Sequence, residues 1–114
     1  MENRTTLTAF SNLERIHLIK RGTVRDCIKV ARKNSRIRRM IVFGSSVTEQ
    51  CNENSDLDIC LDITGSTKEM SLFESVADMS EICDGDCDIL IYSSISEPLK
   101  STIDRNGVVV YELS

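Results

Sequence analysis

Residues 41–62, IVFGSSVTEQCNENSDLDICLD, decide the fold. The mainly apolar run at 39–43 lies between basic residues and a Gly-Ser pair, which predicts a short buried strand that ends in a tight turn. In 57–63, apolar residues alternate with Asp and Cys, and this period of two predicts a second strand with one core face and one polar face. The polar stretch 46–55 between the strands predicts a short helix followed by a loop.

The turn and the second strand carry a spaced set of polar residues, in which Gly44 and Ser45 are followed after ten residues by Asp56 and Asp58. Side chains two apart on a strand project to the same face, about 7 Å from each other, so the two carboxylates are placed to bridge hard cations. Glycine at such a turn lets backbone N–H groups approach a phosphate, and Ser45 adds a hydroxyl. The four residues predict a site for phosphates bridged by a metal ion.

A third carboxylate would complete a two-metal site, and the candidate is Asp88. It opens the apolar run of 87–92, CDILIY, which predicts a further strand. Asp86 has the same parity and is the alternative candidate, whereas Asp84 lies too far back in the preceding turn. We expect the three carboxylates to converge on one face of the sheet, with oxygens about 3 to 6 Å apart.

Capping signals and apolar periodicity predict helices around these strands. Ser11 with Glu14 opens the first helix, which ends at Gly22, Thr23 caps the second, and Ser66 caps the third. Pro98 opens a fourth helix, and a turn at Asn106 and Gly107 leads to the last strand. The predicted helices and the final strand span 11–22, 23–34, 68–82, 98–105 and 108–111.

The third helix is expected to face the core with a single stripe, formed by Leu72, Phe73, Val76, Ala77, Ser80 and Cys83. Taken in order, the elements predict one small α/β (α+β) domain over 1–114, with a mixed, mostly four-stranded sheet flanked by helices. The helices of 1–35 are expected to pack on a core formed by 36–111.

Composition narrows the range of functions. The net charge is −4 and the pI is near 5.0, so the chain lacks the excess of positive charge that supports non-specific binding to nucleic acids. The sequence also contains no motif that indicates DNA or RNA binding. The first ten residues lack the apolar segment of a signal peptide and no apolar run approaches a membrane span, so we expect a cytoplasmic protein that does not bind membranes. We also expect five reduced, mostly buried thiols, because no C-x-x-C pair occurs: Cys27, Cys51, Cys60, Cys83 and Cys87.

At IVFGSS (41–46), SDLDICLD (55–62) and CDILIY (87–92), the sequence resembles the minimal nucleotidyltransferases of the DNA polymerase β superfamily. Members of this family are often paired with HEPN-domain partners in prokaryotic toxin–antitoxin modules. The resemblance covers roughly residues 24–111 and implies the polymerase β-like nucleotidyltransferase fold.

The resemblance also implies roles for single residues. The residues that would bind the nucleoside triphosphate are Gly44, Ser45 and Ser46. The catalytic residues, which would also bind Mg²⁺ or Mn²⁺, are Asp56, Asp58 and Asp88. Asp88 would in addition help to activate the acceptor hydroxyl.

The implied reaction is transfer of a nucleoside monophosphate, AMP from ATP, to a hydroxyl acceptor with release of pyrophosphate. A tyrosine or serine of a partner protein is one candidate acceptor, and the family resemblance makes a HEPN-type protein a candidate partner. The alternative is an antitoxin-like binding module that keeps the fold and masks such a partner. A small-molecule transferase of the aminoglycoside-modifying kind is the weaker alternative, because those enzymes usually carry an additional acceptor-binding domain.

One departure from the family concerns the stretch after the Gly-Ser pair. Relatives place arginines and a glycine there, whereas 46–54 contains Glu49 and Glu53 and no basic residue. We therefore expect the isolated chain to bind a triphosphate weakly, because charge-assisted hydrogen bonds are missing. The basic run before the first strand consists of Arg36, Arg38 and Arg39. These arginines either bind phosphate or, as is commoner for such a run, form an exposed charge cluster.

Overall fold

The computed structural model of the chain describes residues 12–113. Its helices and strands are α1 (Arg21–Arg32), β1 (Ile37–Phe43), β2 (Leu57–Ile63), α2 (Met70–Ile82), β3 (Cys87–Ile91), α3 (Glu97–Asn106) and β4 (Val108–Glu112). Short 3-10 turns are η1 (Leu13–Arg15), η2 (Leu18–Lys20), η3 (Gly44–Val47) and η4 (Tyr92–Ser94). The sheet order is β3-β2-β1-β4, with β2 and β3 parallel and the other neighbours antiparallel. This mixed four-stranded sheet confirms the predicted fold class.

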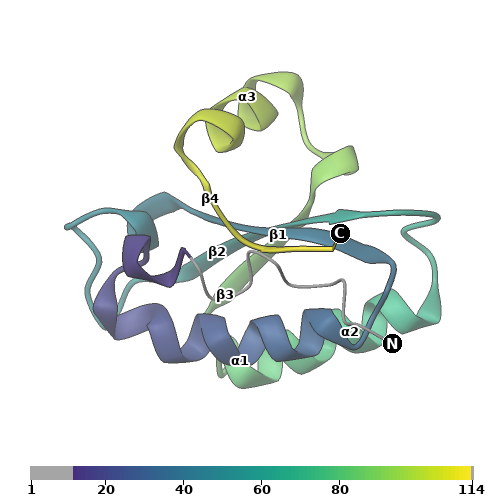
Figure 1. Cartoon of the computed structure of the whole chain (residues 1–114), viewed down its shortest axis with the longest axis horizontal. Coiled ribbons are helices and arrows are strands. Elements are labelled where there is room, and N and C mark those ends of the chain that lie inside the picture. The colour runs from purple at the N-terminus through teal and green to yellow at the C-terminus, as the bar shows by residue number, and fades with distance from the viewer. Residues whose placement is uncertain (1–11, 114) are drawn as a thin grey trace.

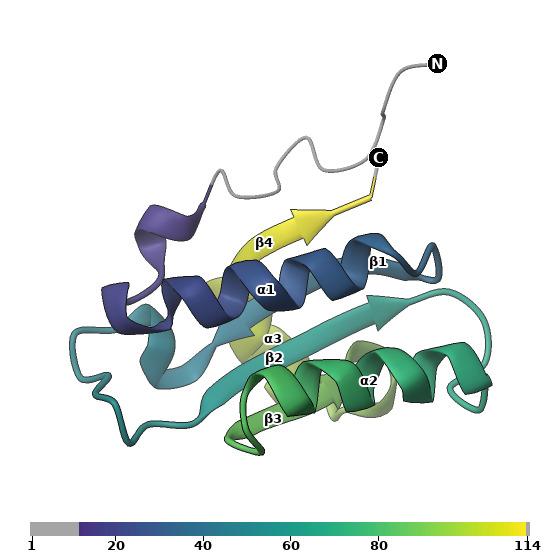
Figure 2. The same cartoon turned by 90° about the horizontal axis from the view of Figure 1, so that it is seen from below.

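Helices lie on both faces of the sheet (Figure 1). α1 and α2 run side by side across one face (Figure 2), and α3 lies over the other face. The main core lies between the sheet and the α1–α2 pair, and its fully buried side chains include Val24, Ile28, Met40, Ile59, Leu61 and Met79. Removal of this apolar area from water is the main term that holds the layers together.

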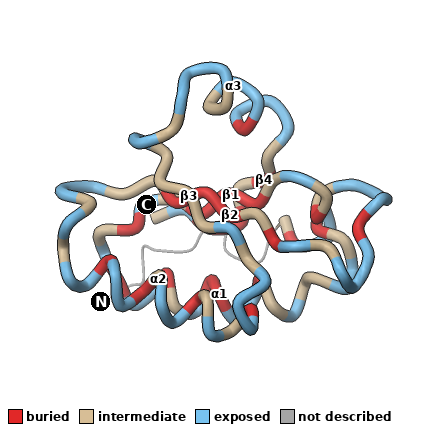
Figure 3. The backbone as a smooth tube through the Cα atoms, turned by 180° about the vertical axis from the view of Figure 1, so that it is seen from behind, coloured by how far each residue is buried: buried red, intermediate tan, exposed pale blue. Residues whose placement is uncertain are grey.

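The face under α3 has a smaller core. Ile41, Cys60 and Ile103 are buried there, and only partly buried side chains surround them. Figure 3 shows the difference along the backbone, because α3 is mostly exposed whereas the central strands are largely buried. The helix α3 therefore leaves much of its own surface and part of this sheet face open to solvent.

The alternation in β2 explains how the sheet divides these two environments. Leu57 and Ile59 are buried in the main core, whereas Cys60 belongs to the cluster under α3. Asp58 has the same parity as Cys60 and therefore lies on the α3 side. The predicted strand with two unlike faces is confirmed.

The predicted N-terminal helix is wrong. The two turns η1 and η2 occupy its place, and the Ser11 cap lies outside the described residues. The break occurs at His17, whose backbone N–H donates to the Ser46 carbonyl, 2.7 Å away, while its extended ψ of 136° leaves the helical range. α1 then begins at Arg21, so Thr23 is not its cap. A tertiary hydrogen bond thus overrides the local helical pattern.

The start of α2 also differs from prediction. The helix begins at Met70, and Ser66 does not cap it, because its hydroxyl accepts a hydrogen bond from the backbone of Lys68 in the preceding turn. Glu69, expected as the partner in the capping box, instead forms an ion pair with Arg36 at 3.1 Å. The interaction with a neighbouring segment therefore replaces the local cap.

The core-facing stripe of α2 was only partly predicted. Leu72 and Cys83 are buried and Val76 is partly buried, as expected, but Phe73 is 57% exposed. The buried face instead includes Ser75 and Met79, and Ala77 is exposed. A hydrogen bond of 3.0 Å from the Asn34 side chain to the Ser75 hydroxyl holds the helix in this rotation about its axis.

The remaining boundaries agree with the sequence within two residues, except that only the turn η3 forms in the stretch predicted as a short helix. α3 is capped by Ser96, whose hydroxyl accepts from the Leu99 backbone, with Pro98 in the first turn. All five cysteines are free thiols, of which four are buried and Cys87 is partly buried. No helix within residues 12–113 has both the length and the apolar character needed to cross a bilayer.

Candidate active site

Gly44 is the residue at which β1 turns into η3. Its φ of +75° lies in the left-handed region, which glycine adopts without strain. A Cβ atom at this position would overlap the carboxylate of Asp58, which lies directly against the glycine. The turn therefore requires glycine for two reasons, and the second one ties the Gly-Ser motif to the Asp-Leu-Asp motif in space.

Asp58 and Asp88 are direct neighbours across the parallel strands β2 and β3, where their Cα atoms form one register pair. Register partners point to the same face of a sheet, so both carboxylates lie on the α3 side. Phe43 is the partner of Asp58 on the opposite neighbour β1 and shares this face. The predicted placement of Asp88 beside Asp58 is thus confirmed, whereas Asp86 lies before β3, where its carbonyl accepts from the Leu57 backbone at 3.0 Å.

The electrostatic environment of Asp58 is that of a partly buried carboxyl group among like charges. Its pKa is raised, first by removal from water and then by the negative charges of Asp88 and Asp56. Within residues 12–113, none of the three carboxylates forms an ion pair with a basic side chain. Their mutual repulsion is therefore left uncompensated by the described part of the protein.

Such a set of oxygen ligands fits a hard divalent cation, because a cation would relieve the repulsion that raises the pKa of Asp58. Asp56 and Asp88 are exposed and free to turn toward a shared ion. In the described part of the chain, however, no three His, Cys, Asp or Glu side chains are already gathered as a metal site. Closer convergence of Asp56, Asp58 and Asp88 stays a prediction.

The two serines of the motif have different environments. Ser45 is partly buried and lines a cleft, and its carbonyl accepts hydrogen bonds from the Thr48 backbone at 3.0 Å and from the Thr48 hydroxyl at 2.9 Å. Ser46 is fully buried, and its hydroxyl has no hydrogen-bond partner among residues 12–113. The structure therefore brings Gly44 and Ser45, but not the Ser46 side chain, to the surface of the cleft.

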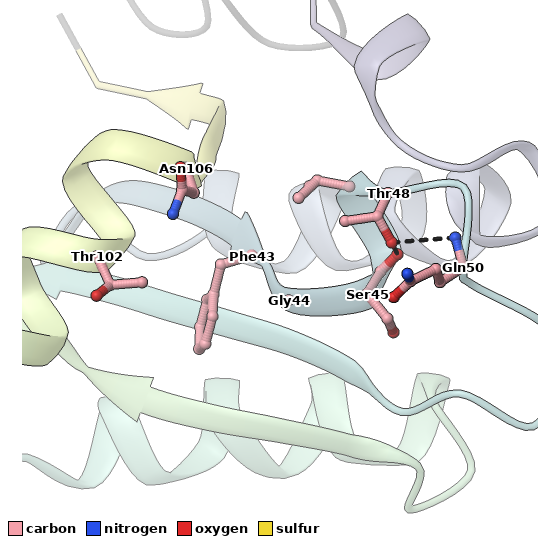
Figure 4. Close-up of a pocket in the computed structure, with 8 residues that line it drawn as sticks. Phe43, Gly44, Ser45, Thr48, Gln50, Thr102 and Asn106 are labelled. Carbon is pink, nitrogen blue, oxygen red and sulfur yellow. Dashed lines mark hydrogen bonds between the residues drawn. The ribbon is translucent and has the colours of Figure 1, made fainter.

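The cleft has a volume of about 540 Å³ and lies between η3 and α3 (Figure 4). One wall belongs to the Gly-Ser turn and the residues after it, and the other wall to the last turns of α3. The lining residues that the sequence analysis did not single out are Phe43, Val47, Thr48, Gln50, Thr102 and Asn106. No local motif marks Thr102 and Asn106 as site residues, because only the return of α3 over the end of β1 brings them here.

The basic and acidic residues considered above lie elsewhere. Arg39 pairs with Asp62 at 2.9 Å and lies over the Tyr92 ring, 5.3 Å from its centroid. Arg36 pairs with Glu69 and does not line the cleft. Glu49 lines a separate hollow beside η1 and η2. None of these three residues lines the cleft, so the alternative phosphate-binding role of Arg36 and Arg39 and the expected acidic influence of Glu49 have no support from its lining.

Another hollow, at the far end of β1, contains the remaining arginine of the basic run. It is lined by Arg38 and Arg39 together with Asp62 and Glu112. None of these four residues lines the cleft beside Gly44. The commoner interpretation of this run, an exposed charge cluster, agrees with this placement for Arg38, which is exposed.

A mixed sheet with Gly44 beneath Asp58, and with Asp58 next to Asp88, defines a domain of the nucleotidyltransferase type. The family model described as Polymerase beta, Nucleotidyltransferase matches residues 25–114, so the chain belongs to this family. The resemblance seen in the sequence is thereby confirmed. A comparison with curated proteins found no match.

Solved structures support the same fold. A toxin–antitoxin structure with AMP-PNP has a TM-score of 0.64 at 22% identity and covers 80% of this chain and 72% of that chain. A tri-AMPylated HEPN toxin of Shewanella oneidensis in complex with MNT antitoxin gives 0.62 at 18% identity, with 82% and 72% covered. The toxin–antitoxin pair MntA–HepT gives 0.60 at 21% identity, with 79% and 70% covered. At these identities the similarity concerns the fold.

Proposed function

We propose that this chain is a metal-dependent nucleotidyltransferase that transfers AMP from ATP to a hydroxyl group of a partner protein. The observation that carries the proposal is the register pairing of Asp58 with Asp88 directly above Gly44. This arrangement places acidic metal ligands next to a turn that phosphate groups can approach. The family supports the reaction class, and the AMP-PNP and the AMPylated HEPN toxin in two similar structures support ATP and a protein acceptor.

The reaction forms one phosphorus–oxygen bond and breaks another. The acceptor hydroxyl oxygen attacks the α-phosphorus of ATP, the bond from this phosphorus to the oxygen that bridges to the β-phosphorus breaks, and pyrophosphate leaves. Asp88, which is exposed at the start of β3, accepts the hydroxyl proton. Ser45 and the backbone of Gly44 orient the phosphate groups beside Asp58.

The cation belongs to the same site. Mg²⁺ or Mn²⁺, when held by Asp56, Asp58 and Asp88, supplies charge neutralisation for the phosphate groups. We expect either ion to raise the melting temperature, because it relieves the repulsion among the carboxylates and binds only the folded chain. The double variant Asp56→Asn/Asp58→Asn should keep the fold and lose this response. A full metal-dependent shift in the double variant would place the ion elsewhere.

The direct test is a transfer assay with ATP labelled at the α-phosphate, with the protein partner that copurifies with this chain as acceptor. Label should move to the partner with the wild-type chain and not with Asp58→Asn. Asp78→Asn is the matched control, because this aspartate is exposed on α2, away from Asp58. Equal label transfer by the wild type and by Asp58→Asn would overturn the proposed role of the site.

An antitoxin-like binding module is the second candidate function. It is favoured by one observation: among the described residues that line the cleft, none is basic, so a triphosphate receives little positive charge there. The similar structures that pair MNT antitoxins with HEPN toxins support a partner of this kind. In this case the chain would inhibit its partner by covering it, without chemical modification.

One comparison separates the two candidates. The Asp56→Asn/Asp58→Asn variant is mixed with the partner in the presence of ATP and Mg²⁺, and the partner's toxicity is measured. A masking module inhibits equally well with or without the two carboxylates. An enzyme loses its inhibition together with the label transfer, even though the complex still forms.

A further inference from the structure

The cleft between η3 and α3 has two chemically different ends (Figure 4). At one end lie Ser45 and Gly44, and the Asp58 carboxylate lies against Gly44. At the other end Thr102 and Asn106 project from the last turns of α3. The side chain of Phe43 lies between the two ends. A ligand that reaches from end to end would touch the phosphate-binding turn, an aromatic ring and a polar helix face in that order.

The lining side chains indicate which part of a nucleotide fits this space. Among the described residues that line the cleft, none is charged, and the polar groups are hydroxyls and the carboxamides of Gln50 and Asn106. Away from the end formed by Gly44 and Ser45, a triphosphate gains little, because it would lose water there without contacting a positive charge. An uncharged nucleoside fits better, since its sugar can pack against the Phe43 ring and the carboxamide of Asn106 can pair with an edge of the base. The volume of about 540 Å³ is also typical of small-ligand sites.

We infer that this cleft binds the nucleoside half of the nucleotide and that Asn106 reads the base, so that the site prefers adenine to guanine. The inference rests on the proposed function for the position of the phosphates at Gly44 and Ser45. With the phosphates at Gly44 and Ser45, the sugar lies against Phe43 and the base lies against the end of α3.

Asn106 is suited to recognise the base because of its position and because its carboxamide is available for hydrogen bonds. It is exposed at the end of α3, and its carboxamide forms no hydrogen bond with any residue of 12–113. Thr102 lies four residues earlier and therefore on the same helix face. Its hydroxyl donates to the Pro98 carbonyl at 3.1 Å, which leaves an acceptor and a methyl group for the ligand.

The preference for adenine follows from hydrogen-bond complementarity. Adenine presents a ring-nitrogen acceptor next to an amino donor, and a carboxamide offers one donor and one acceptor at matching spacing. Guanine presents two acceptors on the corresponding edge, so the carboxamide oxygen of Asn106 would face an acceptor and lose a bond. Asn106 is therefore a specificity-determining residue, separate from the carboxylates that take part in the reaction.

The experiment measures binding of adenosine, ATP and GTP to the full chain by titration calorimetry, with Mg²⁺ present for the nucleotides. We expect Asn106→Ala to weaken the binding of adenosine and of ATP by a similar factor of about ten, which is the size of one lost bidentate contact. The affinity for GTP should be nearly unchanged. The ratio of ATP to GTP affinity should fall by the same factor. Asn54→Ala is the matched control, because Asn54 is exposed in the loop before β2, outside the cleft.

Adenosine separates this inference from the proposed reaction. It carries no phosphate and needs no metal, so its affinity should not change in Asp58→Asn even if AMP transfer fails altogether. Equal adenosine affinity for wild type and Asn106→Ala, or displacement of adenosine by inorganic triphosphate alone, would overturn the inference. If no label is transferred but adenosine still binds in a manner that depends on Asn106, the nucleoside site is supported and the proposed reaction is contradicted.

Discussion

The two faces of the sheet differ in what covers them. α1 and α2 cover one face and bury a continuous apolar core, whereas α3 covers only part of the other face and leaves the carboxylates and the cleft accessible. The same strands serve both faces, because adjacent residues such as Asp58 and Ile59 point in opposite directions. Stability is therefore concentrated on one side, and the candidate chemistry is placed on the other.

The largest expected effect comes from the same substitution, leucine to alanine, made once on each face of the sheet. Leu61→Ala removes a fully buried side chain from the α1–α2 face and should lower the free energy of unfolding by about 2–5 kcal/mol. Leu99→Ala, on the partly buried side of α3, should cost about 1 kcal/mol, because less area is lost and alanine favours the helix. Urea unfolding measures both variants. Equal losses would show that α3 closes its face as tightly as α1 and α2 close theirs.

A second comparison concerns the glycine beneath Asp58. Gly44→Ala and Gly85→Ala both place alanine at a positive φ, which costs about 1–2 kcal/mol. Only at Gly44 does the new Cβ also overlap a carboxylate, since nothing lies within 4 Å of a Cβ at Gly85. The free energy of unfolding should therefore fall further for Gly44→Ala, and its metal response should weaken. Identical behaviour of the two variants would mean that Asp58 moves aside without cost.

The charge of the cleft can be tested with two arginine substitutions. Gln50→Arg adds a cation to the cleft and should tighten ATP binding by about 1 kcal/mol, the value of one charge-assisted hydrogen bond. Glu49→Arg changes the charge by two units but acts in the separate hollow, so it should have the smaller effect. Calorimetry with Mg²⁺ measures both affinities. A larger gain for Glu49→Arg would show that Glu49 reaches the bound phosphates.

The smallest expected effect concerns pH. The raised pKa of Asp58 means that the folded chain holds this proton more tightly than the unfolded chain does. Its ionisation therefore costs stability as the pH rises from the ordinary value of 3.8 through the raised pKa, and costs nothing below that window. In metal-free buffer, Asp58→Asn should be more stable than the wild type by about 0.2–1 kcal/mol at neutral pH, and the gain should vanish in acid. A gain that is independent of pH would have another cause.

The sequence alone determined the strands of the sheet and the face that Asp58 and Asp88 share. Periodicity of two in 57–63 predicts which residues share a face, and this is a property of any strand. For the same reason the parity of Asp58 and Asp88 was sufficient to place both on one face once their strands were neighbours. The need for glycine at position 44 followed from the turn, although the contact with Asp58 did not.

Tertiary structure decided everything that depends on segments far apart in the chain. The hydrogen bond from His17 to Ser46 ends the predicted first helix, and the one from Asn34 to Ser75 selects the buried face of α2. The cleft exists only because α3 returns over the end of β1 and brings Asn106 toward Ser45. Local periodicity specifies which residues lie together on one element, whereas the packing of elements against each other decides which face is buried and which face is left open for a ligand.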